Sequence, residues 1–301
     1  MIWQFSAFAI LMHIFAYLFN GTLLMMLKHR RVVNSRVYMF HMIISELFMN
    51  ITQNILVEFP YFFPQDPAFY SFWSVKFVEI FSQLGYQSKF YIAILMALNR
   101  MWVIYKPIGS EVFSTKMLMK YLTSGWIVLL FRQMIIIIPE DCYWKMDLVQ
   151  FQIMAVCENI ENHQTRMFID TFISHFTHVF IPWVAVFLNI IVFLCLRRRK
   201  IKSQLPKTNS ERVLVINSLV VSLILTVNYL YNYFYTLLEP TLSEESDAVQ
   251  SAFSFFNLYG CSCFNFIVFF LLDPITRKNI IMFLSKDKRR VSTTVTAITT
   301  F

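Results

Sequence analysis

The stretch ALNRMWVIYKP, Ala97 to Pro107, sets an arginine at the end of a long apolar run, with more apolar residues and a Lys-Pro pair directly after it. A guanidinium group in the centre of a bilayer is costly, so such a residue marks the boundary of a membrane. Arg100 then either extends to the lipid headgroups or turns inward to pair with another helix. The stretch therefore predicts the end of a membrane-spanning helix.

The composition of the whole chain agrees with a membrane protein. It is 57% hydrophobic and 18% aromatic but only 15% charged, with five glycines in 301 residues. Such a chain is too apolar for a water-soluble domain and too long for one compact core.

Seven segments reach the length that a membrane helix needs, because a hydrocarbon layer of about 30 Å takes about 20 residues of α-helix. These segments are Ile2 to Leu27, Val37 to Phe59, Phe77 to Tyr105, Met117 to Pro139, Phe168 to Leu196, Val213 to Leu238 and Ala248 to Leu272. We therefore expect an all-α membrane protein, a seven-transmembrane helix bundle that occupies residues 1–272.

Most of the 26 basic residues lie in alternate connections, namely 28–36, 106–120 and 197–212, and in the tail from 277 to 290. The other connections are acidic. Lys and Arg in short loops stay on the cytoplasmic side, so we expect the N-terminus outside and the C-terminus inside. The net charge of +8 then follows from this topology and from anionic inner-leaflet lipid. No nucleic-acid partner is needed to explain it.

Two short regions follow the predicted bundle. Asp273 and Pro274 are an N-cap and a first-turn proline, and apolar residues recur from 275 to 284, so residues 273–285 are expected to form an interfacial helix. Residues 286–301 are expected to form a disordered cytoplasmic tail. Its serines and threonines either serve a kinase or arrestin or have no partner.

The opening stretch resembles the Asp-Arg-Tyr segment of rhodopsin-like G-protein-coupled receptors, which is also followed by an apolar pair and a proline. Other landmarks of that family occur in the same order. They are Glu46 in helix 2, Trp126 in helix 4, Pro182 in helix 5 and a degraded Asn-Pro-x-x-Tyr at Asn265 to Phe269 in helix 7. The resemblance spans nearly the whole chain.

Further features are similar to the nematode serpentine chemoreceptors, in the broad grouping with classes g, v and x. They are Asn99-Arg100 in place of Asp-Arg, phenylalanine-rich spans and the segment LLDPITR from Leu271 to Arg277. The resemblance implies a chemosensory receptor of the plasma membrane, in the sensory cilia of neurons. It implies that an extracellular small molecule binds in the outer half of the bundle and that the receptor activates a heterotrimeric G protein.

Other classes of function lack their sequence signals. A membrane hydrolase would need a metal or nucleophile cluster, but His175 and His178 have no third ligand at the same depth, so we expect no enzyme, metal or cofactor. A ligand-gated channel or transporter of the plasma membrane is the alternative. It would need helices lined with polar residues throughout, or paired broken helices.

The candidate ligand-binding residues are polar and lie at inward spacing in the outer half of the bundle. They are Ser82, Tyr86 and Gln87 in helix 3, Ser174 and His178 in helix 5, Asn232 in helix 6 and Tyr259 in helix 7. A structural hydrogen bond is the alternative role for each. Ser82 stands where aminergic receptors carry an aspartate, so the resemblance argues against a biogenic amine. Arg132 has Glu79, Asp170 or an acidic ligand as candidate partners.

Helix 3 contains a lysine deep in the predicted membrane. Lys89 precedes Arg100 by 11 residues, about 16 Å along a helix, and Glu46 follows Arg36 to a similar depth in helix 2. In rhodopsin-like receptors, the positions that correspond to Glu46 and Lys89 help to hold a sodium ion. The resemblance therefore implies that the ammonium group of Lys89 would take the place of that cation here. Either Glu46 and Lys89 form a buried ion pair, or Lys89 is neutral or faces a water-filled cavity.

The resemblance also implies a switch at the inner end of helix 3. Glu211, at the start of helix 6, is a candidate partner that holds Arg100 until a ligand shifts the equilibrium. The neutral Asn99 replaces an aspartate and is expected to leave the resting state less tightly held. Asn265 belongs to the corresponding motif of helix 7. The alternative is that Arg100 only anchors the helix at the headgroups.

The family usually ties the top of helix 3 to the second outer loop by a disulfide, but no cysteine lies near Val75 here. Cys142 and Cys157 both lie in that outer loop, which faces an oxidising compartment. They either bridge each other or remain two free thiols.

Overall fold

The computed structural model describes residues 2–28, 34–55, 73–105, 111–137, 142–147, 152–157, 180–202, some positions between 219 and 230, 263–272 and 274–285. Its elements are α1 (Ile2–Lys28), α2 (Asn34–Gln53), α5 (Trp73–Tyr105), the 3-10 helix η2 (Glu111–Phe113), α6 (Thr115–Ile137), β1 (Cys142–Asp147), β2 (Gln152–Cys157), α8 (Ile181–Lys202), α11 (Phe264–Phe266), the π-helix η5 (Ile267–Leu272) and α12 (Pro274–Leu284). This part of the chain is helical apart from one hairpin.

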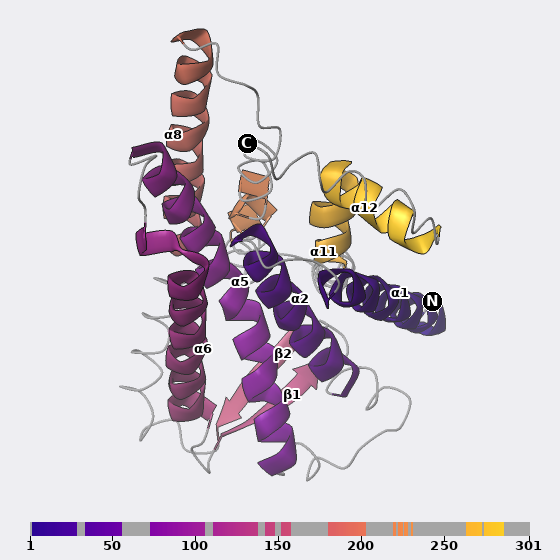
Figure 1. The fold of residues 1–301 in the computed structure, drawn as a ribbon. Coiled ribbons are helices and arrows are strands. Elements are labelled where there is room, and N and C mark those ends of the chain that lie inside the picture. The colour runs from indigo at the N-terminus through magenta and orange to yellow at the C-terminus, as the bar shows by residue number, and fades with distance from the viewer. Residues whose placement is uncertain are drawn as a thin grey trace, which may run out of the picture.

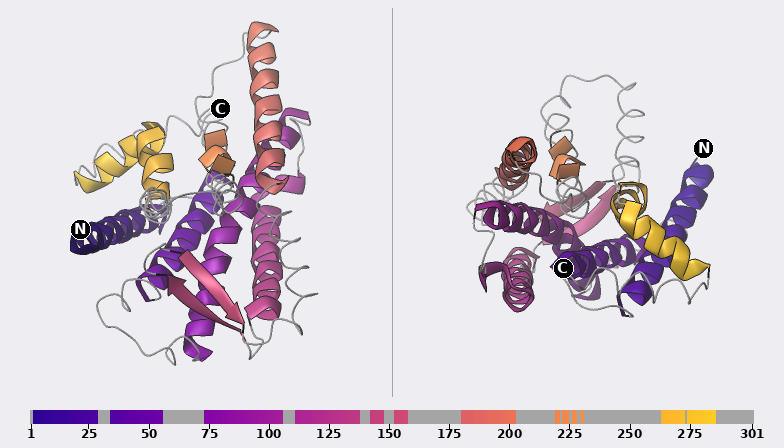
Figure 2. Two further views of the ribbon diagram at one scale, coloured as in Figure 1. Left: turned by 180° about the vertical axis from the view of Figure 1, so that it is seen from behind. Right: turned by 45° about the horizontal axis from the view of Figure 1, so that its top comes forward.

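Helix α5 is the centre of the fold. It has 33 residues and contacts α2, α6 and α8, while α2 also contacts α1 and α11. Figure 1 shows α2 and α6 running along α5, with α1 at a steep angle to α2 on the side away from α6, beside α12. The rear view in Figure 2 shows the same arrangement. At 1.5 Å per residue α5 is about 50 Å long, which is more than a hydrocarbon layer requires.

The first four expected spans correspond to α1, α2, α5 and α6. Helix α8 covers the later part of the fifth, and the sixth and seventh lie mostly outside the described residues. Among the described helices, one is long and apolar enough to cross a membrane by length and composition alone, Ile10–Lys28 with mean hydropathy 1.8. The seven-span count and the orientation of the termini stay predictions.

The described helices expose apolar side chains and bury polar ones. Leu18 and Val128 are 68% and 66% exposed, whereas Asn20 and Glu46 are fully buried and Lys89 is 1% exposed. A water-soluble domain shows the reverse, because buried charges cost free energy and exposed apolar surface is kept small. This distribution is typical of helices that face lipid outward and one another inward.

A glycine on α5 brings the backbones of α2 and α5 together. A Cβ atom at Gly85 would lie 2.7 Å from the carbonyl oxygen of Ser45 and 3.0 Å from the backbone nitrogen of Met49. Beside this contact the hydroxyls of Ser45 and Ser88 share a hydrogen bond at 2.6 Å. Small residues allow such close approach between membrane helices, so α2 and α5 form one tightly packed pair.

The segment after α6 contains an antiparallel hairpin in addition to the expected helices. Strand β1 pairs with β2 so that Cys142 lies opposite Cys157 and Asp147 opposite Gln152. Strand β1 also contacts α5. The cysteine pair therefore lies at the open end of the hairpin, away from its turn.

Candidate functional site

A hydrogen-bond network lies between α1, α2 and α11. The side-chain amide of Asn20 donates to Glu46 Oε1 at 2.9 Å, and the backbone N–H of Asn265 donates to Glu46 Oε2 at 2.7 Å. The side-chain amide of Asn265 donates to Asn20 Oδ1 at 2.8 Å, and all three residues are fully buried. Two of the predicted residues, Glu46 and Asn265, are thus joined directly and also through Asn20, which was not a predicted site residue. The signals that could have found it are its mid-span amide and the pair Asn20-Gly21, which inverts the Gly-Asn of helix 1 in rhodopsin-like receptors.

Lys89 lies next to this network. Its ammonium group contacts the sulfur of Met49 at 3.7 Å, and it is close enough to Glu46 to interact with it electrostatically. The two carboxylate oxygens of Glu46 already accept hydrogen bonds from Asn20 and Asn265. Glu46 and Lys89 therefore share one buried region, and the ion pair between them stays a prediction.

The inner end of α5 is fastened to α2 by a tyrosine. The Asn99 side-chain amide donates to the Tyr38 hydroxyl at 3.1 Å, and that hydroxyl donates to the carbonyl oxygen of Leu95 at 3.2 Å. Asn99 is buried, and the half-buried Arg100 interacts electrostatically with Tyr38. We call these two hydrogen bonds the Tyr38 clasp. The neutral Asn99 was expected to leave the resting state less tightly held, but its side chain has a hydrogen-bond partner on another helix. Glu211, the candidate partner of Arg100, lies outside the described residues.

The outer half of α5 presents the first three candidate ligand residues. Ser82 and Gln87 are buried, and the half-buried Tyr86 packs edge-on against Phe90 with ring centroids 5.2 Å apart. A guanidinium N–H of Arg132 donates to the side-chain oxygen of Gln87, which joins α6 to this zone. The other four candidates, Ser174, His178, Asn232 and Tyr259, lie outside the described residues.

Arg132 and Glu79 are not hydrogen-bonded to each other, although sequence analysis made Glu79 a candidate partner. Glu79 is fully buried and accepts a hydrogen bond from the Gln83 side chain at 2.9 Å. Glu79 and Gln87 are eight residues apart on α5, which is about 12 Å along the helix axis. Arg132 lies at the level of Gln87, so the depth of α6 against α5 decides its partner.

A second contact that the sequence did not predict joins α2 to α6. The indole N–H of Trp126 donates to Nδ1 of His41 at 3.0 Å. Trp126 was identified as a family landmark, but His41 carried no signal beyond its polar character. The contact adds α6 to the pair formed by α2 and α5.

The hairpin register is compatible with a disulfide between Cys142 and Cys157, one of the two alternatives that the sequence leaves open. Residues directly opposite in an antiparallel pair have Cα atoms about 4.5 to 5.5 Å apart, and disulfides span about 4.4 to 6.8 Å. The described cysteines of the helices, Cys195 and Cys263, are free thiols. The bridge in the outer loop stays a prediction.

The comparison with protein families decides what class of protein this arrangement belongs to. A family described as the serpentine type 7TM GPCR chemoreceptor Srx matches residues 10–272. The chain belongs to this family. Serpentine receptor class XA 10 of Caenorhabditis elegans is 24% identical to it over 266 residues, 80% of this chain and 77% of the relative.

Membership of the Srx family confirms the resemblance drawn from Asn99-Arg100 and from the segment after helix 7. The chain is a multi-pass membrane protein of the G-protein-coupled chemoreceptor type. The buried polar network and the apolar exterior of the described helices are the features expected of such a protein.

Proposed function

We propose that this Srx chain is a chemosensory receptor that binds an extracellular small molecule in the outer half of its helix bundle and activates a heterotrimeric G protein at its inner face. One observation carries the proposal: α5 has a buried polar zone in its outer half and, at its inner end, the clasped Asn99 directly before Arg100. The bundle has seven spans, with the N-terminus outside and the C-terminus in the cytosol. The receptor acts in the plasma membrane of sensory cilia.

The ligand contacts Ser82, Tyr86 and Gln87 on α5. Support comes from the burial of two of these side chains and from the Arg132 contact to Gln87, which brings a cation to the same depth. Residues of the later helices, namely Ser174, His178, Asn232 and Tyr259, complete the site. Arg132 brings a positive charge to this zone, and position 82 is a serine and not a carboxylate. Both features favour a ligand with a hydrogen-bond acceptor or an acidic group.

Activation releases the Tyr38 clasp. The distance from Ser82 to Arg100 is 18 residues, about 27 Å of continuous helix, so a ligand that shifts the outer half of α5 also shifts its inner end. A ligand changes the resting equilibrium only through its different affinity for the two states. Arg100, freed from α2, then contacts the G protein, and the tail beyond residue 285 serves kinases or arrestin.

The test uses cells that express the chain together with a G-protein activation sensor and are screened with water-soluble odorants and small carboxylic acids. We expect at least one compound to give a response that Arg100→Ala abolishes at equal surface level. Gln87→Ala should weaken the response about tenfold, because it removes the oxygen that accepts the hydrogen bond from Arg132 in this zone. A hydrogen bond to a charged group contributes about 1.5 kcal/mol.

Two results would count against the proposal. A C-terminal tag that antibodies reach without permeabilisation would reverse the topology. A current that the same compound evokes in purified bilayers, with no G-protein response in cells, would favour a ligand-gated channel or transporter.

A further inference from the structure

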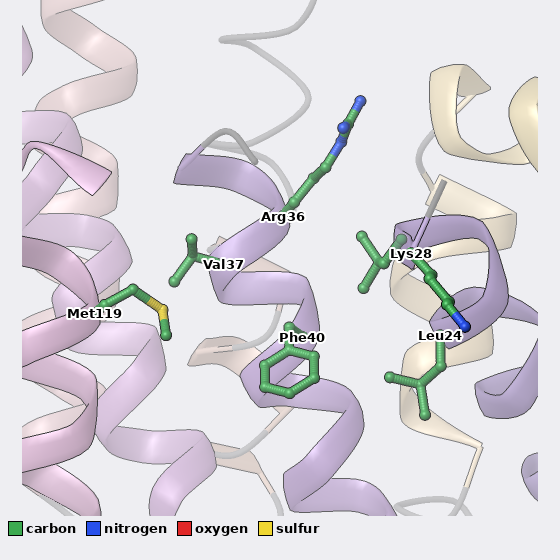
Figure 3. A pocket seen from close by; sticks show the side chains of 7 residues that line it. Leu24, Lys28, Arg36, Val37, Phe40 and Met119 are labelled. Atoms are coloured by element: carbon green, nitrogen blue, oxygen red, sulfur yellow. The ribbon is translucent and has the colours of Figure 1, made fainter. Parts of the chain in front are cut away.

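A groove opens between the end of α1 and the start of α2 and reaches α6. Its volume is about 320 Å³. Its wall is apolar and comes from three helices: Leu24, Leu27, Val37, Phe40 and Met119. Figure 3 shows Leu24 facing the ring of Phe40 across the groove, with Met119 on the far side of α2. The groove therefore has apolar side chains on both sides of α2.

The rim of the same groove is basic. Lys28, the last residue of α1, and Arg36, in the first turn of α2, both line it. In Figure 3 Arg36 extends above the apolar wall, and Lys28 lies on the facing end of α1. Lys116 and Lys120 are exposed on the first turns of α6, on either side of Met119. A positively charged rim over an apolar wall matches the two chemical parts of an anionic phospholipid.

We propose that this groove binds an anionic phospholipid of the inner leaflet. Its phosphate group lies between Lys28 and Arg36, and one acyl chain lies along Leu24, Leu27 and Phe40. The volume is at the lower end of ligand pockets, so it takes part of one chain and leaves the other in the bilayer. The assignment rests on the proposed topology, which puts these two basic residues on the cytoplasmic side.

Other occupants fit the groove less well. A peptide segment of a protein partner would leave backbone N–H and C=O groups without hydrogen bonds against a wall of leucine, valine and phenylalanine. A free phosphate would satisfy the two cations but leave the apolar wall uncovered. A neutral phospholipid would cover the wall but would bind less tightly to the basic rim. Each basic residue near an anionic membrane surface contributes roughly fivefold in affinity.

The experiment measures lipid retention by the purified full-length chain. Detergent micelles with equal amounts of phosphatidylserine and phosphatidylcholine are offered, and native mass spectrometry counts each bound lipid. We expect the wild type to retain phosphatidylserine in preference. Lys28→Gln with Arg36→Gln should lower the ratio of the two lipids about twenty-five-fold, the product of two fivefold effects.

A matched control removes the same charge from another helix. Arg198→Gln with Arg199→Gln removes two charges near the end of α8 and should leave the ratio unchanged. Leu24→Trp keeps both cations but fills the groove, so it should reduce the retention of both lipids. If that variant is not monodisperse, Phe40→Trp, at an exposed side chain of the same wall, serves the same purpose.

The outcomes separate the alternatives. Equal retention of the two lipids by the wild type, or an equal loss in the α8 control, would overturn the site. Competition by glycerophosphoserine at the same concentration as the lipid would show that the cations bind a free phosphate and not a lipid. Ligand-evoked signalling does not enter this measurement, so a failed lipid site and a failed receptor function give different results.

Discussion

Replacing Tyr38 by phenylalanine removes one hydroxyl from the Tyr38 clasp and leaves the ring in place. That hydroxyl accepts from the Asn99 side chain at 3.1 Å and donates to the Leu95 carbonyl oxygen at 3.2 Å. Tyr38 and Asn99 are both buried, so water does not replace the lost partner. Since Asn99 Oδ1 has no hydrogen-bond partner among the described residues, the whole Asn99 amide becomes unsatisfied.

The size of the effect follows from these two bonds. A typical hydrogen bond contributes about 0.5 to 1.5 kcal/mol net, and a buried donor without a partner costs about 1 to 3 kcal/mol. We expect Tyr38→Phe to destabilise the resting state by about 2 kcal/mol, which is about thirty-fold in the equilibrium with the active state. A receptor that rests with about 1% of molecules active would then rise to about a quarter.

The assay is basal G-protein activation, with no ligand, divided by surface level. Tyr91→Phe is the matched control, because it removes the hydroxyl that donates to the Tyr121 carbonyl oxygen at 2.9 Å and so loses one bond between α5 and α6. Tyr38→Phe should raise basal activity and Tyr91→Phe should not. Equal basal activity of Tyr38→Phe and wild type at equal surface level would refute the clasp as a resting-state contact.

Three further predictions test other parts of the site. Arg100→Ala should keep surface level and ligand binding but lose G-protein coupling in the activation assay; normal coupling would make Arg100 a headgroup anchor. Lys89→Met should lower surface expression by flow cytometry, because it removes a cation that interacts with the buried Glu46. Exchanging the two residues should recover part of the loss; an exchange no better than the worse single variant would argue against contact. Cys142→Ser should free Cys157 for maleimide labelling and cost the outer loop about 3 kcal/mol, whereas labelling of both cysteines in unreduced wild type would exclude the bridge.

The ends of the helices were the most predictable part of the fold. The expected spans from Ile2 and Met117 begin within two residues of α1 and α6, because apolar length and flanking lysines mark both ends. Helix α5 begins four residues before the predicted start, at Trp73. Lys76, directly before the predicted start, is buried, as is Glu79 one turn later. A buried charge and a boundary charge look alike in a single sequence.

The partners of the polar residues were less predictable than the residues themselves. Glu46, Asn99, Asn265 and Arg132 were all singled out by residue type and position. Their hydrogen-bond partners depend on how each helix is rotated and how deeply it sits against its neighbour. Single-sequence periodicity gives the inward face but not the relative depth, so Glu79 was a candidate partner of Arg132 and Gln87, its hydrogen-bond partner in the structure, was not.

The interface between α2 and α5 differs along its length. Toward α2, α5 has the backbone contact at Gly85 and the bond between Ser45 and Ser88, so sliding of α5 would drive the backbones of these two helices into each other. Close-packed interfaces respond by switching between discrete arrangements and not by gradual deformation. At the other end of this interface, the Tyr38 hydroxyl joins α2 to α5 by two side-chain hydrogen bonds, which depend on the orientation of α5. We therefore propose that α5 rotates about the Gly85 contact, which would keep the tight packing, open the clasp and connect the outer polar zone to Arg100.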